Sequence, residues 1–130
     1  TKGSGMIHPN MATTLGYILT DAAVPTRDLQ TLLARATELS YNRLTVDGDT
    51  STNDTLVLMA NGASKVKLSA AELVEFAEAL NHVARSLAMQ IARDGEGARK
   101  LVRILVSGAK SEADADRIGV NLKWLLVNCA

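Results

Sequence analysis

Residues 69–93 carry the pattern of one long amphipathic helix, which constrains the fold more than any other stretch of the chain. Ser69 and Glu72 form the S-x-x-E signature of a capping box, which marks a helix start. Gly95 and Gly97 follow the last apolar residue and end the pattern. A helix with one apolar stripe has to pack that stripe against a second apolar layer. The stripe consists of Leu73, Phe76, Ala77, Leu80, Val83, Ala84, Leu87 and Ile91.

Shorter patterns predict the elements of that second layer. Short apolar runs bounded by turn residues predict three strands, at residues 15–20, 55–60 and 101–106. Helical spacing of leucines continues to Leu39, with Thr26 as the predicted N-cap after Pro25. Ser111 is expected to cap a further helix that runs through Ile118 or beyond. This order of strand and helix, repeated three times, indicates an α/β layered domain with mixed sheets packed against helices.

Composition excludes several classes of partner. The 130 residues suffice for one domain but not comfortably for two, and aromatic residues make up 3%, so the core has to be aliphatic. Lys plus Arg and Asp plus Glu number 14 each, and a formal net charge of zero provides no attraction for nucleic acid or an anionic membrane. No apolar run reaches the roughly 20 residues of a membrane-spanning helix. We therefore expect neither nucleic acid nor a membrane as a partner.

The chain also contains few of the residues that commonly bind zinc or form disulfides. Cys129 is the only cysteine, which allows no internal disulfide and fits a reducing compartment such as the cytoplasm. The two histidines, His8 and His82, are far apart in sequence and have no cysteine partners, so no zinc site is indicated. His82 is expected on the flank of the long helix. We predict no metal site.

The acidic, threonine-rich stretch at residues 47–55 is similar in spacing to a calcium-binding loop. Its alternating oxygen side chains are Asp47, Asp49, Ser51 and Asn53. However, Thr52 stands where such a loop requires glycine, and Leu58 stands where it requires a bidentate glutamate. We therefore expect a structural role, in which Asp, Thr and Asn side chains bond the backbone of turns.

The segment before the first predicted strand carries the most distinctive chemistry. Its polar, glycine-containing sequence leads into a small residue, Ala12, and then a hydroxyl residue, Thr13. If the bond between them breaks, Thr13 carries both a nucleophilic hydroxyl and an α-amine, whose reference pKa of about 7.7–8.0 suits a base near neutral pH. The alternative is that Thr13 is an ordinary β-branched residue leading into a strand. Thr14 is the competing hydroxyl.

Three ordered motifs carry a resemblance to a known family. They are Lys2-Gly3-Ser4-Gly5-Met6-Ile7 with Pro9-Asn10-Met11-Ala12-Thr13, then Asp47-Gly48-Asp49-Thr50-Ser51-Thr52-Asn53-Asp54-Thr55 with Ala60-Asn61-Gly62, then Asp94-Gly95-Glu96-Gly97-Ala98. In this order they resemble the ornithine acetyltransferases, also called glutamate N-acetyltransferases. The resemblance extends from Lys2 to about Ile118. Thr14 departs from it mildly, because the family pattern usually has a large apolar residue there.

The resemblance implies a fold, an activity and a processing step. It implies an αββα sandwich of the N-terminal-nucleophile type and self-cleavage between Ala12 and Thr13. Residues 1–12 would then end the upstream (alpha) segment, and residues 13–130 would begin a truncated catalytic (beta) chain. The implied reaction moves acetyl from N-acetylornithine to glutamate through acetyl-Thr13, in cytoplasmic arginine biosynthesis and without a cofactor. The implied assembly is an alpha–beta hetero-oligomer that includes the upstream segment.

The same resemblance assigns two further residues to substrate binding. Lys2 lies eleven positions before Thr13 and matches a substrate-contacting lysine, whose charge suits a carboxylate. Glu96 matches a glutamate that pairs with the amine of an ornithine-like substrate. Without the resemblance, Lys2 reads as a solvated surface charge and Glu96 as an exposed acid after a helix.

Two rival interpretations stay open at this point. The first is an aminopeptidase or amidase of the same N-terminal-nucleophile type, in which water accepts the acyl group. The second is an inactive fragment, because residues 119–130 follow the family pattern poorly and the oxyanion donors would come from the upstream segment.

Overall fold

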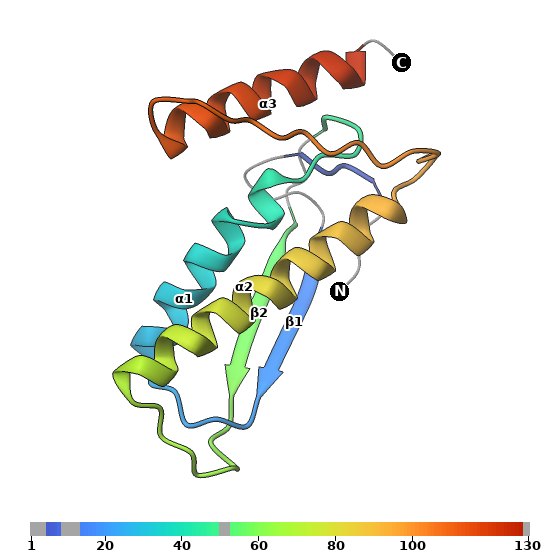
Figure 1. Cartoon of the computed structure of the whole chain (residues 1–130). Coiled ribbons are helices and arrows are strands. Elements are labelled where there is room, and N and C mark those ends of the chain that lie inside the picture. The colour runs from blue at the N-terminus through green and yellow to red at the C-terminus, as the bar shows by residue number, and fades with distance from the viewer. Residues whose placement is uncertain (1–4, 9–13, 50–52, 129–130) are drawn as a thin grey trace.

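The computed structural model of the chain describes residues 5–8, 14–49 and 53–128. Its elements are β1 (Leu15–Thr20), α1 (Thr26–Glu38), the 3-10 helix η1 (Tyr41–Arg43), β2 (Thr55–Ala60), α2 (Ala70–Arg93) and α3 (Glu112–Asn128) (Figure 1). The α/β class is therefore confirmed, and the first two strands have the predicted bounds.

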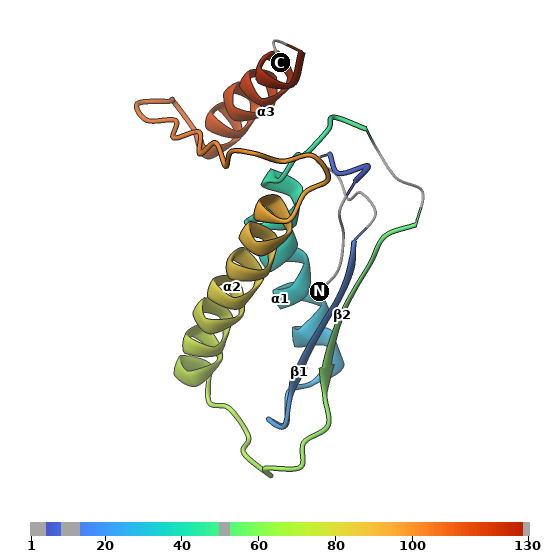
Figure 2. The same ribbon diagram turned by 90° about the vertical axis from the view of Figure 1, so that its right-hand side faces the viewer.

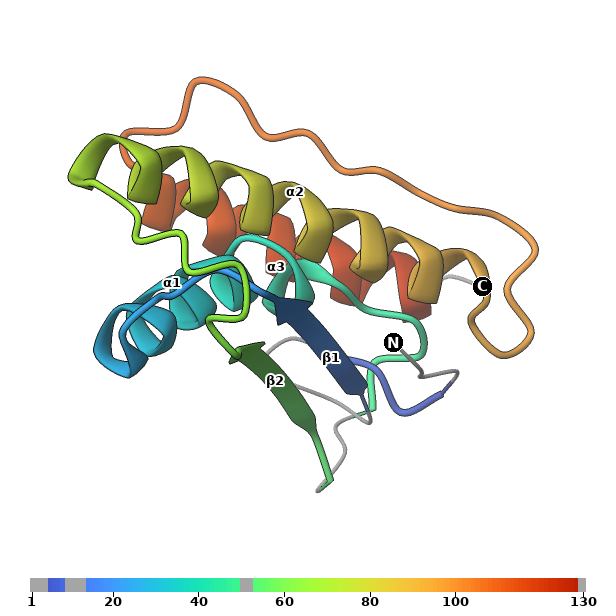
Figure 3. The same cartoon turned by 90° about the horizontal axis from the view of Figure 1, so that it is seen from below.

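The two strands pair in parallel, from Leu15 opposite Thr55 to Thr20 opposite Ala60. A parallel pair needs a long crossover connection, and α1 lies within that connection. Both α1 and α2 cover the same face of the strand pair (Figures 2 and 3). Mixed sheets were expected, but the sheet formed by the described residues is purely parallel.

The core lies between this face of the sheet and the two helices. It is mainly aliphatic, as the low aromatic content predicts. Ala36 of α1 and Ala84 of α2 are both 0% exposed, and such small residues let the two helices approach closely. Ile18, Leu56 and Leu58 pack against the core from the strands. The buried cluster consists of Ile7, Ala36, Tyr41, Leu80, Ala84, Ala88 and Ile91.

The opposite face of the sheet is apolar and exposed. Alternate residues of a strand point to opposite faces, and apart from Thr55 the residues that alternate with the core-facing ones are also apolar. Leu19 is 71% exposed, and Leu15, Tyr17 and Met59 are exposed beside it. We call these four residues the outer sheet face. Contiguous exposed apolar surface of this kind is typical of a face that another element covers.

Helix α2 begins as the sequence predicts. The Ser69 backbone N–H donates to Glu72 Oε2 at 2.8 Å, and the Glu72 backbone N–H donates to Ser69 Oγ at 3.4 Å, which completes the capping box. His82 is exposed on this helix, as expected. The N-cap of α1 differs from the prediction: Pro25 occupies the cap, and Thr26 is the first helical residue. The fixed φ of proline and its missing N–H suit a helix start without a side-chain cap.

The prediction of a third strand, at residues 101–106, is wrong. Residues 101–106 have no regular secondary structure, although their alternating pattern favours a strand. A strand needs a hydrogen-bonding neighbour, and no strand among the described residues pairs with this segment. Leu105 is 87% exposed as a result. The sequence pattern reports the preference of the segment for extended structure but not the presence of a partner.

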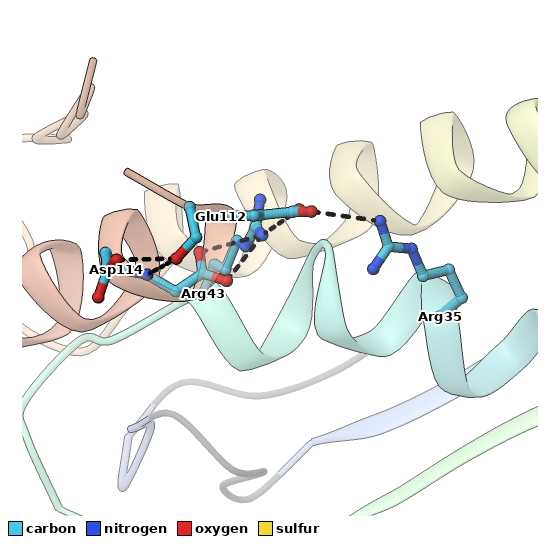
Figure 4. A network of polar contacts seen from close by, with 6 residues as sticks. Arg35, Arg43, Glu112 and Asp114 are labelled. Atoms are coloured by element: carbon cyan, nitrogen blue, oxygen red, sulfur yellow. Dashed lines mark hydrogen bonds and ion pairs between the residues drawn. The ribbon is translucent and has the colours of Figure 1, made fainter. Parts of the chain in front are cut away.

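Helix α3 begins at Glu112, directly after the predicted cap Ser111, whose Oγ accepts from the Asp114 N–H at 3.1 Å. It lies beyond the C-terminal end of α2, away from the sheet (Figures 1 and 2). Exposed ion pairs join its first turn to the body: Glu112 is 3.1 Å from Arg43 Nη2 and 3.6 Å from Arg35 Nη2 (Figure 4). Arg43 also contacts Asp116 at 3.0 Å.

No helix among the described residues combines the length and apolar character needed to span a membrane.

Candidate active site

Residues 5–8, which precede the predicted cleavage bond, are bonded to the loop after η1. Asp47 accepts from two successive backbone N–H groups, with its Oδ2 2.5 Å from Met6 N and its Oδ1 2.9 Å from Ile7 N. The Ile7 carbonyl in turn accepts from the Val46 N–H at 2.8 Å and the Thr45 hydroxyl at 3.0 Å. Ile7 is 2% exposed and belongs to the core. This part of the N-terminal segment is therefore held by both burial and hydrogen bonds.

Thr14, on the other side of the predicted bond, is held in the same way by the start of β2. Its backbone N–H donates to Asp54 Oδ1 at 2.6 Å, and its carbonyl accepts from the Thr55 N–H at 2.8 Å. Thr14 is 5% exposed. Asp47 and Asp54 of the polar stretch thus have a structural role, because they bond the backbone on the two sides of the predicted bond.

Glu96 lies next to the N-terminal segment. A β-carbon placed on Gly5 would be 3.0 Å from Glu96 Oε2 and 3.5 Å from Asp47 Oδ2. The turn after α2 therefore brings the predicted substrate-binding glutamate to a point three residues after Lys2. Its side chain is exposed, as the alternative interpretation of a surface acid also requires.

Close packing holds this turn in place. A β-carbon on Gly95 would be 2.7 Å from Val46 Cγ1, so glycine is needed for the turn to approach the loop that bonds Ile7. Gly97 has a φ of +71°, a conformation that glycine adopts at little cost. The glycines on both sides of Glu96 therefore fix its place beside residues 5–8.

A small pocket lies where these segments meet. Its interior of about 10 Å³ suits a single water molecule and is too small for an amino-acid substrate. Across this region, His8 Nδ1 is 3.2 Å from Thr45 Oγ1. The described residues contain no group of three or more potential metal ligands. The pocket is lined by Ile7, His8, Thr14, Thr37, Tyr41, Leu44 and Leu56.

Three of the four predicted site residues, Lys2, Ala12 and Thr13, lie outside the described residues. The structure describes their neighbours on both sides: Glu96 lies beside Gly5, and Ile7, His8 and Thr14 line one small pocket. Sequence reasoning expected side chains of residues 47–55 to bond turn backbone, but it did not identify the backbone groups that Asp47 and Asp54 bond. The spacing within residues 47–55 gives no indication of partners some 40 residues earlier.

Known proteins similar to this chain indicate its family. The ArgJ family matches residues 1–130. The arginine biosynthesis bifunctional protein ArgJ of Syntrophotalea carbinolica is 51% identical over 124 residues, which cover 93% of this chain and 32% of that protein. The protein of the same name from Listeria monocytogenes is 51% identical over 120 residues, which cover 90% of this chain and 30% of that protein.

A solved structure agrees with these relatives. The crystal structure of the arginine biosynthesis bifunctional protein ArgJ from Bacillus halodurans is similar with a TM-score of 0.64 and 45% identity, covering 68% of this chain and 43% of that one. The chain spans roughly a third of the length of the curated relatives it matches. Because the family match covers every residue, the chain belongs to the ArgJ family.

Proposed function

We propose that this chain forms the region around the nucleophile of an acetyltransferase in arginine biosynthesis. The enzyme would move acetyl from N-acetylornithine to glutamate, with Thr13 as the acyl carrier and without a cofactor. The observation that carries the proposal is that the ArgJ family matches the whole chain. The similar proteins in this family are named arginine biosynthesis bifunctional proteins. The hydrogen bonds to residues on both sides of the Ala12–Thr13 bond support a reaction there.

Thr13 would first be freed by self-cleavage. Its Oγ attacks the Ala12 carbonyl carbon, the hydroxyl proton passes to the amide nitrogen, and the C–N bond breaks. An ester then joins Ala12 to Thr13 Oγ. Water hydrolyses that ester and leaves a carboxylate on Ala12 and a free hydroxyl and α-amine on Thr13. The amine then serves as the base that a threonine nucleophile needs.

Acetyl transfer would follow in two half-reactions. Thr13 Oγ attacks the acetyl carbonyl of N-acetylornithine, and the α-amine passes the hydroxyl proton to the departing ornithine nitrogen. The amine of glutamate next attacks the acetyl ester, and its proton returns to Thr13 Oγ as N-acetylglutamate leaves. Lys2 would hold the substrate α-carboxylate and Glu96 the distal amine of ornithine. The position of Glu96 beside Gly5 supports these two roles.

The proposal extends to the assembly. The upstream segment ending at Ala12 would stay bound to the chain that begins at Thr13, giving an alpha–beta hetero-oligomer in the cytoplasm. The exposed outer sheet face supports an αββα sandwich, because a second sheet would bury Leu15, Tyr17, Leu19 and Met59. In that arrangement α1 and α2 form one outer helical layer.

The test is self-cleavage of a complete precursor, either the natural one or a chimaera in which this chain replaces the matching region of the Listeria protein. We expect the wild-type precursor to split between Ala12 and Thr13 without a protease. Thr13→Ala should leave a single unsplit band on a denaturing gel, because the nucleophile is gone. Thr13→Ser, which keeps a hydroxyl, and Thr14→Ala are the controls and should still split. A Thr13→Ala precursor that splits at this bond would contradict the proposal.

A further inference from the structure

Asp54 extends the pairing of β1 with β2 by one residue toward the predicted cleavage bond. The strand pair nearest the predicted cleavage bond is Leu15 with Thr55, and Thr14 is the residue directly before β1. In a parallel ladder the N–H of Thr14 would meet a backbone carbonyl of the neighbouring strand. Here the Asp54 carboxylate accepts that N–H at 2.6 Å, while the Thr14 carbonyl keeps its ladder bond to the Thr55 N–H at 2.8 Å.

A carboxylate is a stronger acceptor than a neutral backbone carbonyl. Charge-assisted hydrogen bonds are about twice as strong as neutral ones. Thr14 is 5% exposed, so water competes little for its N–H. The backbone of Thr14 is therefore held at both its N–H and its C=O, directly before the first strand residue.

Covalent geometry transmits this constraint to Thr13. The peptide bond between residues 13 and 14 is planar, so the Cα, C and O of Thr13 share a plane with the N–H of Thr14. Fixing the direction of the Thr14 N–H fixes the orientation of that plane. The Cα of Thr13 carries both the hydroxyl side chain and the nitrogen of the bond to Ala12.

We propose that Asp54 is a positioning residue for the Thr13 nucleophile, acting through the backbone N–H of Thr14. The inference rests on the proposed function, because it requires Thr13 to react. Acyl transfer needs its reacting atoms within about 3–3.5 Å and aligned, and a misplacement of 1 Å can cost about 10²-fold in rate. The Asp54 carboxylate restrains the N–H of Thr14 and with it the peptide plane that Thr14 shares with Thr13, and the proposed role is that this restraint helps align the reacting atoms of Thr13.

Asp47 provides a matched comparison within the same chain. It also accepts backbone N–H groups at the strand ends, from Met6 and Ile7. Several residues separate those two from Ala12 in the sequence, whereas Thr14 is bonded directly to Thr13. Ile7 is also held by Val46 and Thr45. Loss of Asp47 should therefore disturb the reaction much less than loss of Asp54.

The experiment compares Asp54→Ala, Asp54→Asn and Asp47→Ala in the complete precursor. Each variant is followed by the rate of self-cleavage on denaturing gels and by its midpoint of unfolding in urea. We expect Asp54→Ala to slow cleavage about 10²-fold. Asp54→Asn keeps an oxygen acceptor of similar shape and should restore most of that loss. Asp47→Ala should slow cleavage less than tenfold, although its unfolding midpoint falls as far as that of Asp54→Ala.

Steady-state kinetics of the cleaved enzyme give a second readout. Asp54→Asn that has completed cleavage should show a lower kcat for acetyl transfer with KM for N-acetylornithine unchanged, because the nucleophile and not the substrate is displaced. Cleavage of Asp54→Ala at the wild-type rate would overturn this inference alone. So would reductions in cleavage rate in Asp54→Ala and Asp47→Ala that are proportional to the stability each variant loses. A wild-type precursor that never splits at Ala12–Thr13 would overturn the proposed function and this inference together.

Discussion

Carboxylates hold both the strand ends and helix α3, but their partners differ. At the strand ends, Asp47 accepts the Ile7 N–H at 2.9 Å and Asp54 accepts the Thr14 N–H at 2.6 Å, and Ile7 and Thr14 are 2% and 5% exposed. At α3, Glu112 pairs with Arg43 and Arg35, and the side chains of these three residues are 58%, 36% and 60% exposed.

The difference shows which contacts fix geometry. A carboxylate bonded to the backbone N–H of a buried residue fixes the chain itself, because water competes little for that N–H. Two exposed side chains that pair lose rotamer freedom and are screened by salt, so the pair contributes little. We therefore expect the strand ends to keep their geometry under conditions that release α3 from the body.

The largest expected effect is in the core between the sheet and the two helices. Leu80→Ala removes a side chain that is 4% exposed and leaves a cavity between α2 and its neighbours. We expect the free energy of unfolding of the chain to fall by about 2–5 kcal/mol. Leu122→Ala in α3 removes the same atoms from a residue that is 40% exposed and should cost below about 1 kcal/mol. Urea unfolding followed by circular dichroism measures both, and equal losses would contradict the comparison.

A glycine in each region gives the next test. Gly95→Ala places a β-carbon 2.7 Å from Val46 Cγ1, so the turn that carries Glu96 or the loop beside Ile7 has to move. We expect a loss of about 1–3 kcal/mol in the free energy of unfolding. Gly119→Ala lies within α3, where the new β-carbon would be 4.0 Å from Val106, and alanine favours a helix by up to about 1 kcal/mol. Destabilisation by Gly119→Ala that matches Gly95→Ala would remove the distinction.

The exposed carboxylate of Glu96 tests whether the strand ends form a substrate site. Glu96→Gln in the complete enzyme removes the charge but keeps the shape. A charge-assisted bond to the ornithine amine is worth about 1.5–3 kcal/mol, so KM for N-acetylornithine should rise about tenfold or more. KM for N-acetylglutamate, whose side chain is anionic, should change little. An equal rise in KM for both substrates would show that Glu96 does not bind the ornithine amine.

The smallest expected effect concerns the pH response of α3. A hydrogen bond from Arg43, followed by the charge of Arg35, lowers the pKa of Glu112 below its ordinary value of 4.5. A carboxyl with a lowered pKa in the folded state stabilises docking above pH 4.5, and that contribution is lost as the pH falls through the lowered pKa. Docking of α3 should therefore weaken only in acid.

Carbon NMR titration checks this prediction. Arg43→Gln should return the pKa of Glu112 toward 4.5. Asp114 is the control within the same helix, because hydrogen bonds from Arg117 and Ser111 lower its pKa. An unchanged pKa of Glu112 in Arg43→Gln would show that the ion pair does not form in solution.

The sequence predicted the local elements well because their signals are local. The capping box at Ser69 and the apolar run at residues 55–60 each specify an element without reference to the rest of the chain. The strand predicted at residues 101–106 failed because a strand depends on a neighbour that no local pattern reports. For the same reason, residues 47–55 could be assigned to backbone bonding, but the pairing of Asp47 with Met6 and of Asp54 with Thr14 required the fold.

The central claim is that Thr13 carries the acetyl group. Rapid quench of cleaved, complete enzyme with N-acetylornithine, followed by peptide mass mapping, tests it most directly. We predict one added acetyl mass on the fragment that begins at Thr13, with the label on Thr13 itself, and loss of that label far faster with glutamate than with water alone. Label on Thr14 would contradict the assignment of the nucleophile, and loss at the same rate with and without glutamate would indicate an amidase instead of a transferase.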